Sequence, residues 1–209
     1  MARHAKGRAQ RVLAIGDAHD SPHLPDKSRF QWMGRHANAT RPDHIVQIGD
    51  WFTFDSCTQH DGNGTIRGRS KPTFRADMKS GAASMDAFNA ELSYNPEKYV
   101  TLGNHENRAD QWENDNPETE GMLGAEYRYL FRSKGWAHTE YGDWLFIGGV
   151  GFTHIPSNQL GKAYGGMVPE NAVARDAVFD IVFGHTHKDR NVTVPKLGSN
   201  NHVRVYNVG

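Results

Sequence analysis

The chain has 209 residues and a mass of 23.4 kDa, enough for one domain with a proper hydrophobic core. Its 24 basic residues balance 24 acidic residues, which argues mildly against a protein that binds nucleic acid mainly through the phosphates. The single cysteine, Cys57, excludes an internal disulfide and a thiolate metal cluster, whereas 12 histidines favour metal binding through imidazole.

The first eleven residues, MARHAKGRAQR, are basic, and we interpret residues 1–11 as a solvated tail in front of one domain at 12–209. The apolar stretch that follows, Val12 to Ile15, is too short for the core of a signal peptide. The longest apolar stretch, Trp144 to Phe152, is broken by three glycines and is too short to span a bilayer. We therefore expect a soluble, cytoplasmic protein with no membrane partner.

Strand-like apolar runs recur along the chain, and each of them ends in polar residues. In chain order these five runs are RVLAIGDAH, HIVQIGD, KYVTLGNHE, WLFIGGVGFTH and DIVFGHTH. A further apolar-rich stretch, HVRVYNVG, closes the chain. Glycine precedes the polar cluster in four of the five runs, where it permits a sharp turn and a close approach.

Three segments between these runs carry apolar residues at helical spacing. The three faces consist of Phe30, Met33 and Ala37, then Phe74, Met78, Met85, Phe88 and Leu92, and then Leu123, Tyr127, Leu130 and Phe131. Because strands alternate with helices, we predict an α/β fold with a largely parallel sheet. We find no internal repeat and no linker that would divide the chain.

The polar residues at the strand ends have the chemistry of metal ligands. In open α/β sheets the ligand site lies beyond the carboxyl ends of the strands, so we expect these residues to converge. Turn formation explains one such residue well, but it explains five convergent clusters poorly. The seven candidate ligands are Asp17, His19, Asp50, Asn104, His154, His185 and His187.

This set is too large for one zinc site, and it lacks the all-oxygen character of a calcium site. Two divalent ions that share a bridging carboxylate would use all the ligands. Mixed imidazole and carboxylate ligands suit manganese, which we expect first, and also iron, zinc or nickel.

The motifs GDAH, GD, GNHE, a later lone histidine and GHTH, in this order, resemble those of the calcineurin-like metallophosphoesterase superfamily. The resemblance extends from residue 12 to about residue 208. It implies a four-layer α/β/β/α sandwich, with a dimetal site at the carboxyl ends of the strands. It also implies that one ion is held by Asp17, His19, Asp50 and His187, and the other by Asp50, Asn104, His154 and His185. Asp50 would then bridge the two ions.

The sequence departs from the family pattern at three places. Asp20, which follows the first motif, adds a carboxylate that we expect near the metals. The second motif continues as GDWFTF without the DRG of the protein phosphatase branch, which disfavours a protein phosphatase. His154 lacks the glycine that often follows this ligand, and His138, in an expected edge strand or turn, is its lower-ranked competitor.

The expected chemistry is hydrolysis by metal activation of water. Two cations roughly 3.5–4 Å apart lower the pKa of a bridging water, and the resulting hydroxide attacks the phosphorus atom. In the family, the position of His105 protonates the leaving oxygen or stabilises the transition state, although a structural histidine at a helix start is the alternative. Glu106 either orients a neighbour or caps the following helix.

Specificity is expected to come from the long connection at residues 52–80, which we interpret as a lid or insertion. Arg67 and Arg69 in this basic stretch are candidate substrate-binding residues, with a solvated basic loop as an equal alternative. Arg108 is another candidate phosphate contact. We expect residues 109–120 to form an acidic loop that discourages a long polyanion.

These features favour a phosphodiesterase that acts on small or nucleotide-like diesters. A nuclease or exonuclease, with nucleic acid as partner, and a phosphomonoesterase are the alternatives. An inactive metal-binding scaffold is disfavoured because all seven ligand positions are filled. The chain ends directly after VYNVG, where more sequence would normally follow, so truncation and a compact bacterial or viral homologue both fit.

Overall fold

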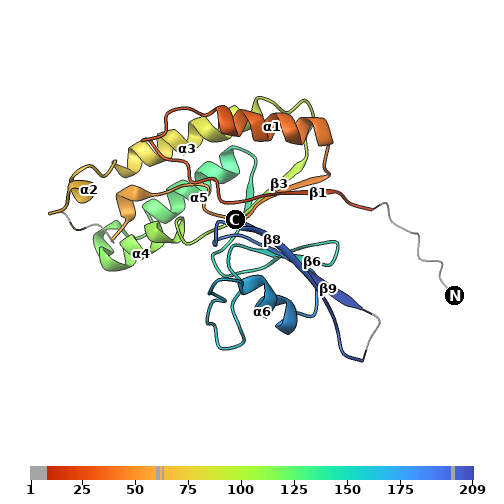
Figure 1. Cartoon of the computed structure of the whole chain (residues 1–209). Coiled ribbons are helices and arrows are strands. Elements are labelled where there is room, and N and C mark those ends of the chain that lie inside the picture. Colours follow the sequence, from red (N-terminus) through yellow and green to blue (C-terminus); the bar gives the residue numbers. More distant parts are fainter. Residues whose placement is uncertain (1–8, 60–61, 63, 199–200) are drawn as a thin grey trace.

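Two β-sheets lie face to face in the computed structural model, which describes residues 9–59, 62, 64–198 and 201–209 (Figure 1). Residues 1–8 of the expected basic tail lie outside the described residues. The elements in chain order are β1 (Val12–Ile15), α1 (Ser28–Thr40), β2 (His44–Gln47), η1 (Asp55–Cys57), α2 (Ile66–Arg69), α3 (Phe74–Asn89), β3 (Glu97–Thr101), α4 (Asn107–Asp115), η2 (Pro117–Thr119), α5 (Leu123–Ser133), β4 (Ala137–Thr139), β5 (Leu145–Ile147), β6 (Val150–Thr153), α6 (Pro169–Asp176), β7 (Ile181–Phe183), β8 (Asp189–Pro195) and β9 (His202–Val208).

The first sheet is fully parallel, with the strand order β1-β2-β3-β4. Strand β2 is buried along its whole length because both faces of the sheet are covered. On one face Ile45 packs under α1, α3 and α5 in a core with Phe30, Phe88 and Phe131. On the other face Val46 packs against the second sheet. This alternation of side-chain direction follows from the two-residue period of a strand.

The second sheet is mixed, with the strand order β5-β6-β7-β9-β8. Strands β6, β7 and β9 are parallel, and an antiparallel strand borders them at each edge. The run WLFIGGVGFTH, which we expected to be one strand, forms the hairpin of β5 and β6. Gly148 and Gly149 make its turn with φ angles of +59° and +86°, which favour glycine.

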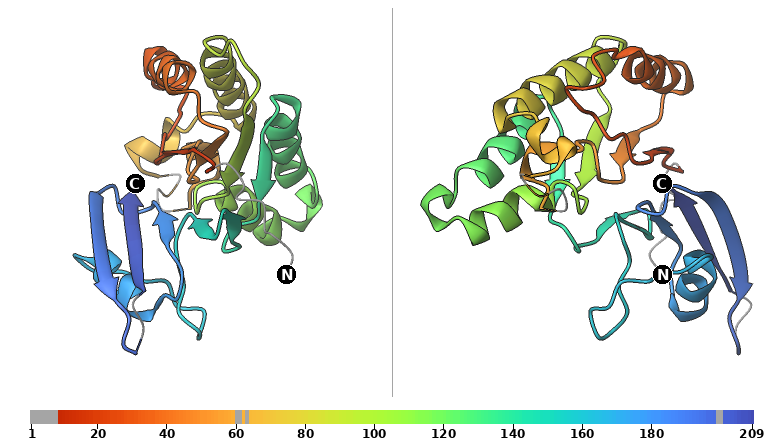
Figure 2. Two further views of the ribbon diagram at one scale, coloured as in Figure 1. Left: turned by 90° about the vertical axis from the view of Figure 1, so that its right-hand side faces the viewer. Right: turned by 60° about the vertical axis from the view of Figure 1, so that its left-hand side comes forward.

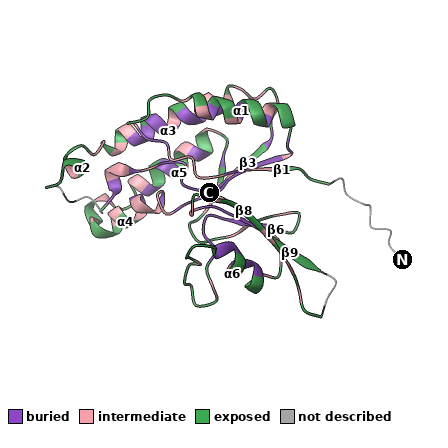
Figure 3. Cartoon of the chain, viewed as in Figure 1, coloured by how far each residue is buried: buried purple, intermediate pink, exposed green. Residues whose placement is uncertain are grey.

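The predicted four-layer α/β/β/α sandwich is confirmed. Val46 of β2 and Ile48, which directly follows β2, pack against Phe152 and Val182 of the second sheet and form the core between the two sheets. Helix α6 covers the outer face of the second sheet, where Val173 packs with the strand residues. Figure 2 shows the two halves from other sides, and Figure 3 shows buried positions on the inner sides of α3 and α6. Within the described residues, no helix is long and apolar enough to cross a membrane.

The three expected helices are present as α1, α3 and α5, although α3 ends before Leu92. The expected acidic loop at residues 109–120 is wrong, because this segment forms α4 and the short helix η2. Two of its acidic side chains serve the fold: Asp110 accepts hydrogen bonds from Arg128, and Glu113 accepts one of 2.9 Å from the backbone N–H of Gly124 at the start of α5. Helix α6 and strand β8 were not expected from the sequence.

Candidate metal centre

All seven candidate ligands come together where strands of the two sheets end. Asp17 and His19 follow β1, Asp50 follows β2, and Asn104 follows β3. His154 follows β6 of the second sheet, and His185 and His187 follow β7. The convergence arises because the carboxyl ends of parallel strands lie at one edge of a sheet, and the two sheets meet at that edge.

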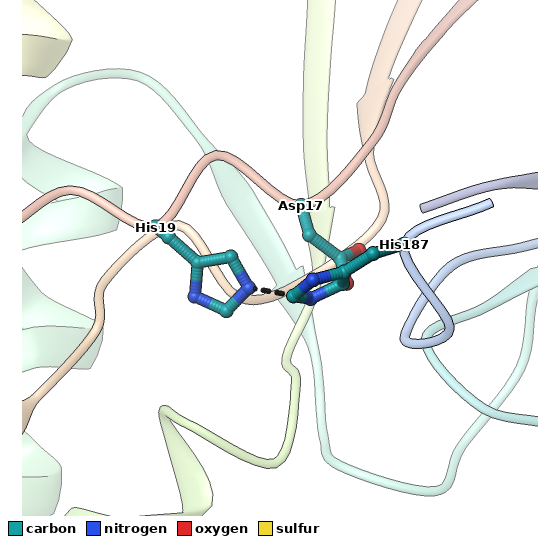
Figure 4. Close-up of side chains that lie close together, drawn as sticks. All are labelled: Asp17, His19 and His187. Atoms are coloured by element: carbon teal, nitrogen blue, oxygen red, sulfur yellow. Dashed lines mark hydrogen bonds and ion pairs between the residues drawn. The ribbon is translucent and has the colours of Figure 1, made fainter. Parts of the chain in front are cut away.

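The first cluster consists of Asp17, His19 and His187, whose ligand atoms lie within 4.8 Å of one another (Figure 4). The Nε2 atoms of His19 and His187 are 2.9 Å apart. His187 Nε2 also lies 3.4 Å from Asp17 Oδ2. Two imidazoles and one carboxylate therefore direct their donor atoms at one point, as the ligands of a transition metal ion do.

The second cluster consists of Asp50, His154 and His185. His154 Nε2 lies 3.4 Å from Asp50 Oδ2, and Asn104 Oδ1 lies 2.8 Å from both His154 Nε2 and His185 Nδ1. Asp50 also groups with His19 of the first cluster, since His19 Nε2 lies 3.8 Å from Asp50 Oδ2. The Asp50 carboxylate thus lies between the two clusters, and the arrangement is compatible with a dimetal site.

Four of the seven residues have a left-handed backbone, which is uncommon for residues other than glycine. His19, Asp50, His185 and His187 have φ angles of 46°, 52°, 69° and 51°. Such conformations cost roughly 1–3 kcal/mol each and persist where the surrounding structure imposes them, often at functional sites. The concentration of strain at these positions supports a functional role for the loops.

Three glycines lack the side chain that would collide with the candidate ligands. A Cβ atom on Gly103 would lie 2.0 Å from Asp50 Oδ1, and one on Gly184 would lie 2.4 Å from Asp17 Oδ1. A Cβ atom on Gly49 would lie 2.7 Å from His154 Nδ1. The strand-end glycines that stand out in the sequence are thus required for close approach at the centre.

Glu106 is fully buried and joins the loops that follow β2 and β3. Its carboxylate accepts hydrogen bonds from the backbone N–H groups of Asp50 (2.9 Å), Phe52 (3.0 Å) and Gly103 (2.8 Å). Its side chain makes no capping hydrogen bond to α4. Of the two roles that the sequence left open, Glu106 therefore orients its neighbours.

Burial disfavours the charged form of the ionisable groups in the centre. It raises the pKa of Asp17 to about 7 and, together with the charge of Glu106, raises the pKa of Asp50 to about 9. Burial lowers the pKa of His154 to about 3 and, with His187, lowers that of His19 to about 4. Neutral imidazoles are metal ligands, and a bound cation would stabilise the carboxylates, so the donor set fits divalent ions.

Asp20 does not add a carboxylate to the centre, and our expectation for it is wrong. Its Oδ1 atom accepts a 2.5 Å hydrogen bond from Lys27, which also donates to Ser80 Oγ on α3. The backbone of Asp20 pairs with that of Phe52, and this pairing directs the side chain away from the clusters and into the layer of α1 and α3.

His105 lies beside the two clusters and forms a third group of potential ligands with His19 and Asp50, with its Nε2 3.9 Å from Asp50 Oδ2. The carbonyl oxygen of Thr53 accepts hydrogen bonds from His105 Nδ1 (2.8 Å) and from Arg108 Nη1 (2.9 Å). Arg108 Nη2 lies 3.1 Å from His105 Nε2. Burial and the Arg108 charge lower the pKa of His105 to about 3, so the imidazole is neutral and Nε2 accepts from Arg108.

The remaining sequence candidates lie farther out. His138 is on the edge strand β4, where Nε2 lies 3.2 Å from Glu140 Oε1, and it belongs to none of the clusters found among the described residues. Arg67 and Arg69 are exposed on α2. Neither makes a hydrogen bond or ion pair with any of the seven ligand candidates.

Sequence reasoning missed two side chains next to the centre. Arg29 of α1 donates a 3.0 Å hydrogen bond from Nη2 to the carbonyl oxygen of His19. The ring of Tyr141, in the turn between β4 and β5, has its centroid 6.5 Å from that of His154. No sequence signal marks either residue, because the first belongs to a helix and the second to a turn that only the packing of the two sheets brings here.

Comparison with known proteins identifies the family. The family model for calcineurin-like phosphoesterases matches residues 10–189, a segment that includes all seven candidate ligands. A search of curated proteins finds no match. The matched segment covers most of the chain, and it contains the two clusters described above. The chain therefore belongs to the calcineurin-like phosphoesterase family.

Proposed function

We propose that this metal-dependent phosphoesterase is a phosphodiesterase that acts on small or nucleotide-like diesters. The observation that carries the proposal is the position of the Asp50 carboxylate between two clusters of nitrogen and oxygen donors. Asp17, His19, Asp50 and His187 would hold one ion, and Asp50, Asn104, His154 and His185 the other. We infer manganese as the ion from the mixed imidazole and carboxylate donors.

Two such ions, when bound, polarise the phosphoryl group and lower the pKa of bound water. The residues of the chain then hold and orient the substrate. Arg108 uses one N–H of Nη1 on the carbonyl oxygen of Thr53 and one N–H of Nη2 on His105 Nε2. A guanidinium has five N–H groups, so we expect the remaining three to be available to a phosphoryl oxygen. We propose Arg108 as the residue that binds the phosphoryl group at this side of the centre.

His105 is the proposed proton donor to the leaving oxygen. Its Nδ1–H is fixed on the carbonyl oxygen of Thr53, so Nε2 is the atom that faces Asp50 and the centre. Because Nε2 accepts from Arg108 in the resting structure, donation requires its protonation and release from Arg108. The negative charge of a bound phosphoryl group would favour both changes.

The preference for a diester rests on charge. A monoester carries one more negative charge than a diester; two divalent ions can accommodate this charge, whereas the carboxylates of Asp17, Asp50 and Glu106 oppose it, so we expect a modest preference for the diester. Arg108 uses part of its hydrogen-bonding capacity within the protein, which leaves less of it for the additional charge. The acidic segment at residues 109–120 gives no support, because Asp110 and Glu113 are engaged in the fold.

The test compares bis(p-nitrophenyl) phosphate with p-nitrophenyl phosphate, on enzyme that is metal-stripped and then reloaded with manganese. We expect hydrolysis only after reloading, and a higher kcat/KM for the diester. A clear preference for the monoester would make the protein a phosphomonoesterase. Processive degradation of DNA at physiological salt would make it a nuclease. Either result would overturn the proposed specificity.

A further inference from the structure

A polar hollow with a volume of about 270 Å³ lies between α2 and the loops that continue from the metal centre. Its polar lining consists of His23, Asp55, Thr58, Arg67, Ser70 and Lys71. Arg67 and Lys71 are cations, Asp55 is the one acidic residue of this lining and His23 adds an imidazole, so the net charge of the lining is positive and attracts an anion. We call it the distal pocket.

The distal pocket is connected to the centre by two chain segments. His23 follows the candidate ligand His19 by four residues. Asp55 follows Thr53, whose carbonyl oxygen fixes both His105 and Arg108. Burial lowers the pKa of Arg108, whereas the charges of Asp50 at the centre and of Asp55 at the pocket both oppose this shift.

Two cations of the pocket differ in how they are held. Lys71 Nζ donates a 2.7 Å hydrogen bond to the carbonyl oxygen of Thr58, which fixes the ammonium group at the wall. The Arg67 guanidinium makes no hydrogen bond or ion pair with any residue that the structure describes. Arg67 therefore retains its planar set of donors for an external group, and this geometry matches the oxygens of a phosphate.

Arg69 provides the contrast. It is on the same short helix as Arg67, is equally basic and is also exposed, but it does not line the pocket. The two arginines therefore share residue type, helix and exposure, and they differ in that only Arg67 lines the distal pocket.

We propose that the distal pocket binds a second phosphate group of the substrate, apart from the phosphodiester at the centre. The inference rests on the proposed function and narrows it to diesters that carry a terminal phosphate, such as a short 5′-phosphorylated nucleotide. Arg67 supplies the charge-assisted contact, and Lys71, Ser70 and His23 supply further donors. The pocket thus selects substrates by a group that does not react.

The kinetic test uses a dinucleoside monophosphate with and without a terminal 5′-phosphate. Arg67→Gln should raise the KM for the phosphorylated substrate about tenfold, while kcat and the KM for the other substrate stay unchanged. Arg69→Gln, the matched control, should leave both substrates unaffected. Equal effects of the two substitutions, or equal effects of Arg67→Gln on both substrates, would overturn the proposal.

A binding test separates this inference from the proposed function. Isothermal titration of the manganese-loaded full chain with inorganic phosphate should reveal one more bound phosphate in the wild type than in the Arg67→Gln/Lys71→Gln double variant, because phosphate at the metal centre is common to both, and Arg69→Gln should keep the wild-type stoichiometry. Unchanged stoichiometry in the double variant would refute the pocket. If the wild-type enzyme hydrolyses no phosphoester but this phosphate still binds, the proposed function fails and the pocket stands.

Discussion

Removal of the Glu106 carboxylate should destabilise the fold and the metal centre together. In Glu106→Ala, the N–H groups of Asp50, Phe52 and Gly103 lose their acceptor inside the protein. An unsatisfied buried donor costs about 1–3 kcal/mol, so the loss of all three costs roughly 3–9 kcal/mol, toward the lower end if water enters the space. This is a large share of the stability of an ordinary domain.

Glu106→Gln gives a graded result because of how the oxygens are used. Oε2 accepts from Asp50 and Gly103, whereas Oε1 accepts from Phe52 alone. A glutamine whose carbonyl oxygen takes the place of Oε2 keeps two of the three hydrogen bonds. Its NH₂ group then faces the N–H of Phe52, and these two donors cannot pair. We expect a loss of about 1–3 kcal/mol.

The assay is urea unfolding at equilibrium, with the bound metal per chain measured by elemental analysis. Glu118→Gln is the control: Glu118 is exposed on η2, and its substitution should change the free energy of unfolding by less than about 0.5 kcal/mol. A loss of less than about 1 kcal/mol for Glu106→Ala, or a glutamine variant less stable than the alanine variant, would refute the reasoning.

Three further predictions concern the centre itself. Asp50→Asn should leave the chain folded but remove most bound metal and nearly all hydrolysis. Elemental analysis that finds one ion or none per chain in active wild-type protein would exclude the two-metal interpretation. His105→Ala should keep both ions and lower kcat by roughly 10²–10⁴-fold, less for substrates with good leaving groups; an equal loss for good and poor leaving groups would argue against a proton donor. Above pH 6.5 unfolded histidine is neutral, while the raised pKa values of Asp17 (about 7) and Asp50 (about 9) keep protons on the folded chain. The free energy of unfolding of the metal-free protein should therefore fall as the pH rises from 6.5 to 9, which urea unfolding at several pH values would check. Metal affinity should rise over the same range because metal ligands must be deprotonated, and metal titration at several pH values would check this.

The sequence by itself determined the strands and the residues that gather at their ends. Apolar runs that close on glycine and a polar residue are local patterns, and parallel strands necessarily bring such ends to one edge. Asp17, Asp50 and His185 could be placed in one centre for this reason. The main helices could be predicted because their apolar faces repeat at the period of the α-helix.

Only the tertiary structure decided where individual side chains point. Asp20 is adjacent to His19 in sequence, yet its carboxylate binds Lys27, which also contacts Ser80 on α3. Arg67 and Arg69 are equivalent in the sequence, and only one of them lines the distal pocket. Such directions depend on backbone angles and on contacts between segments far apart in the chain, and neither is encoded in a local pattern of residue types.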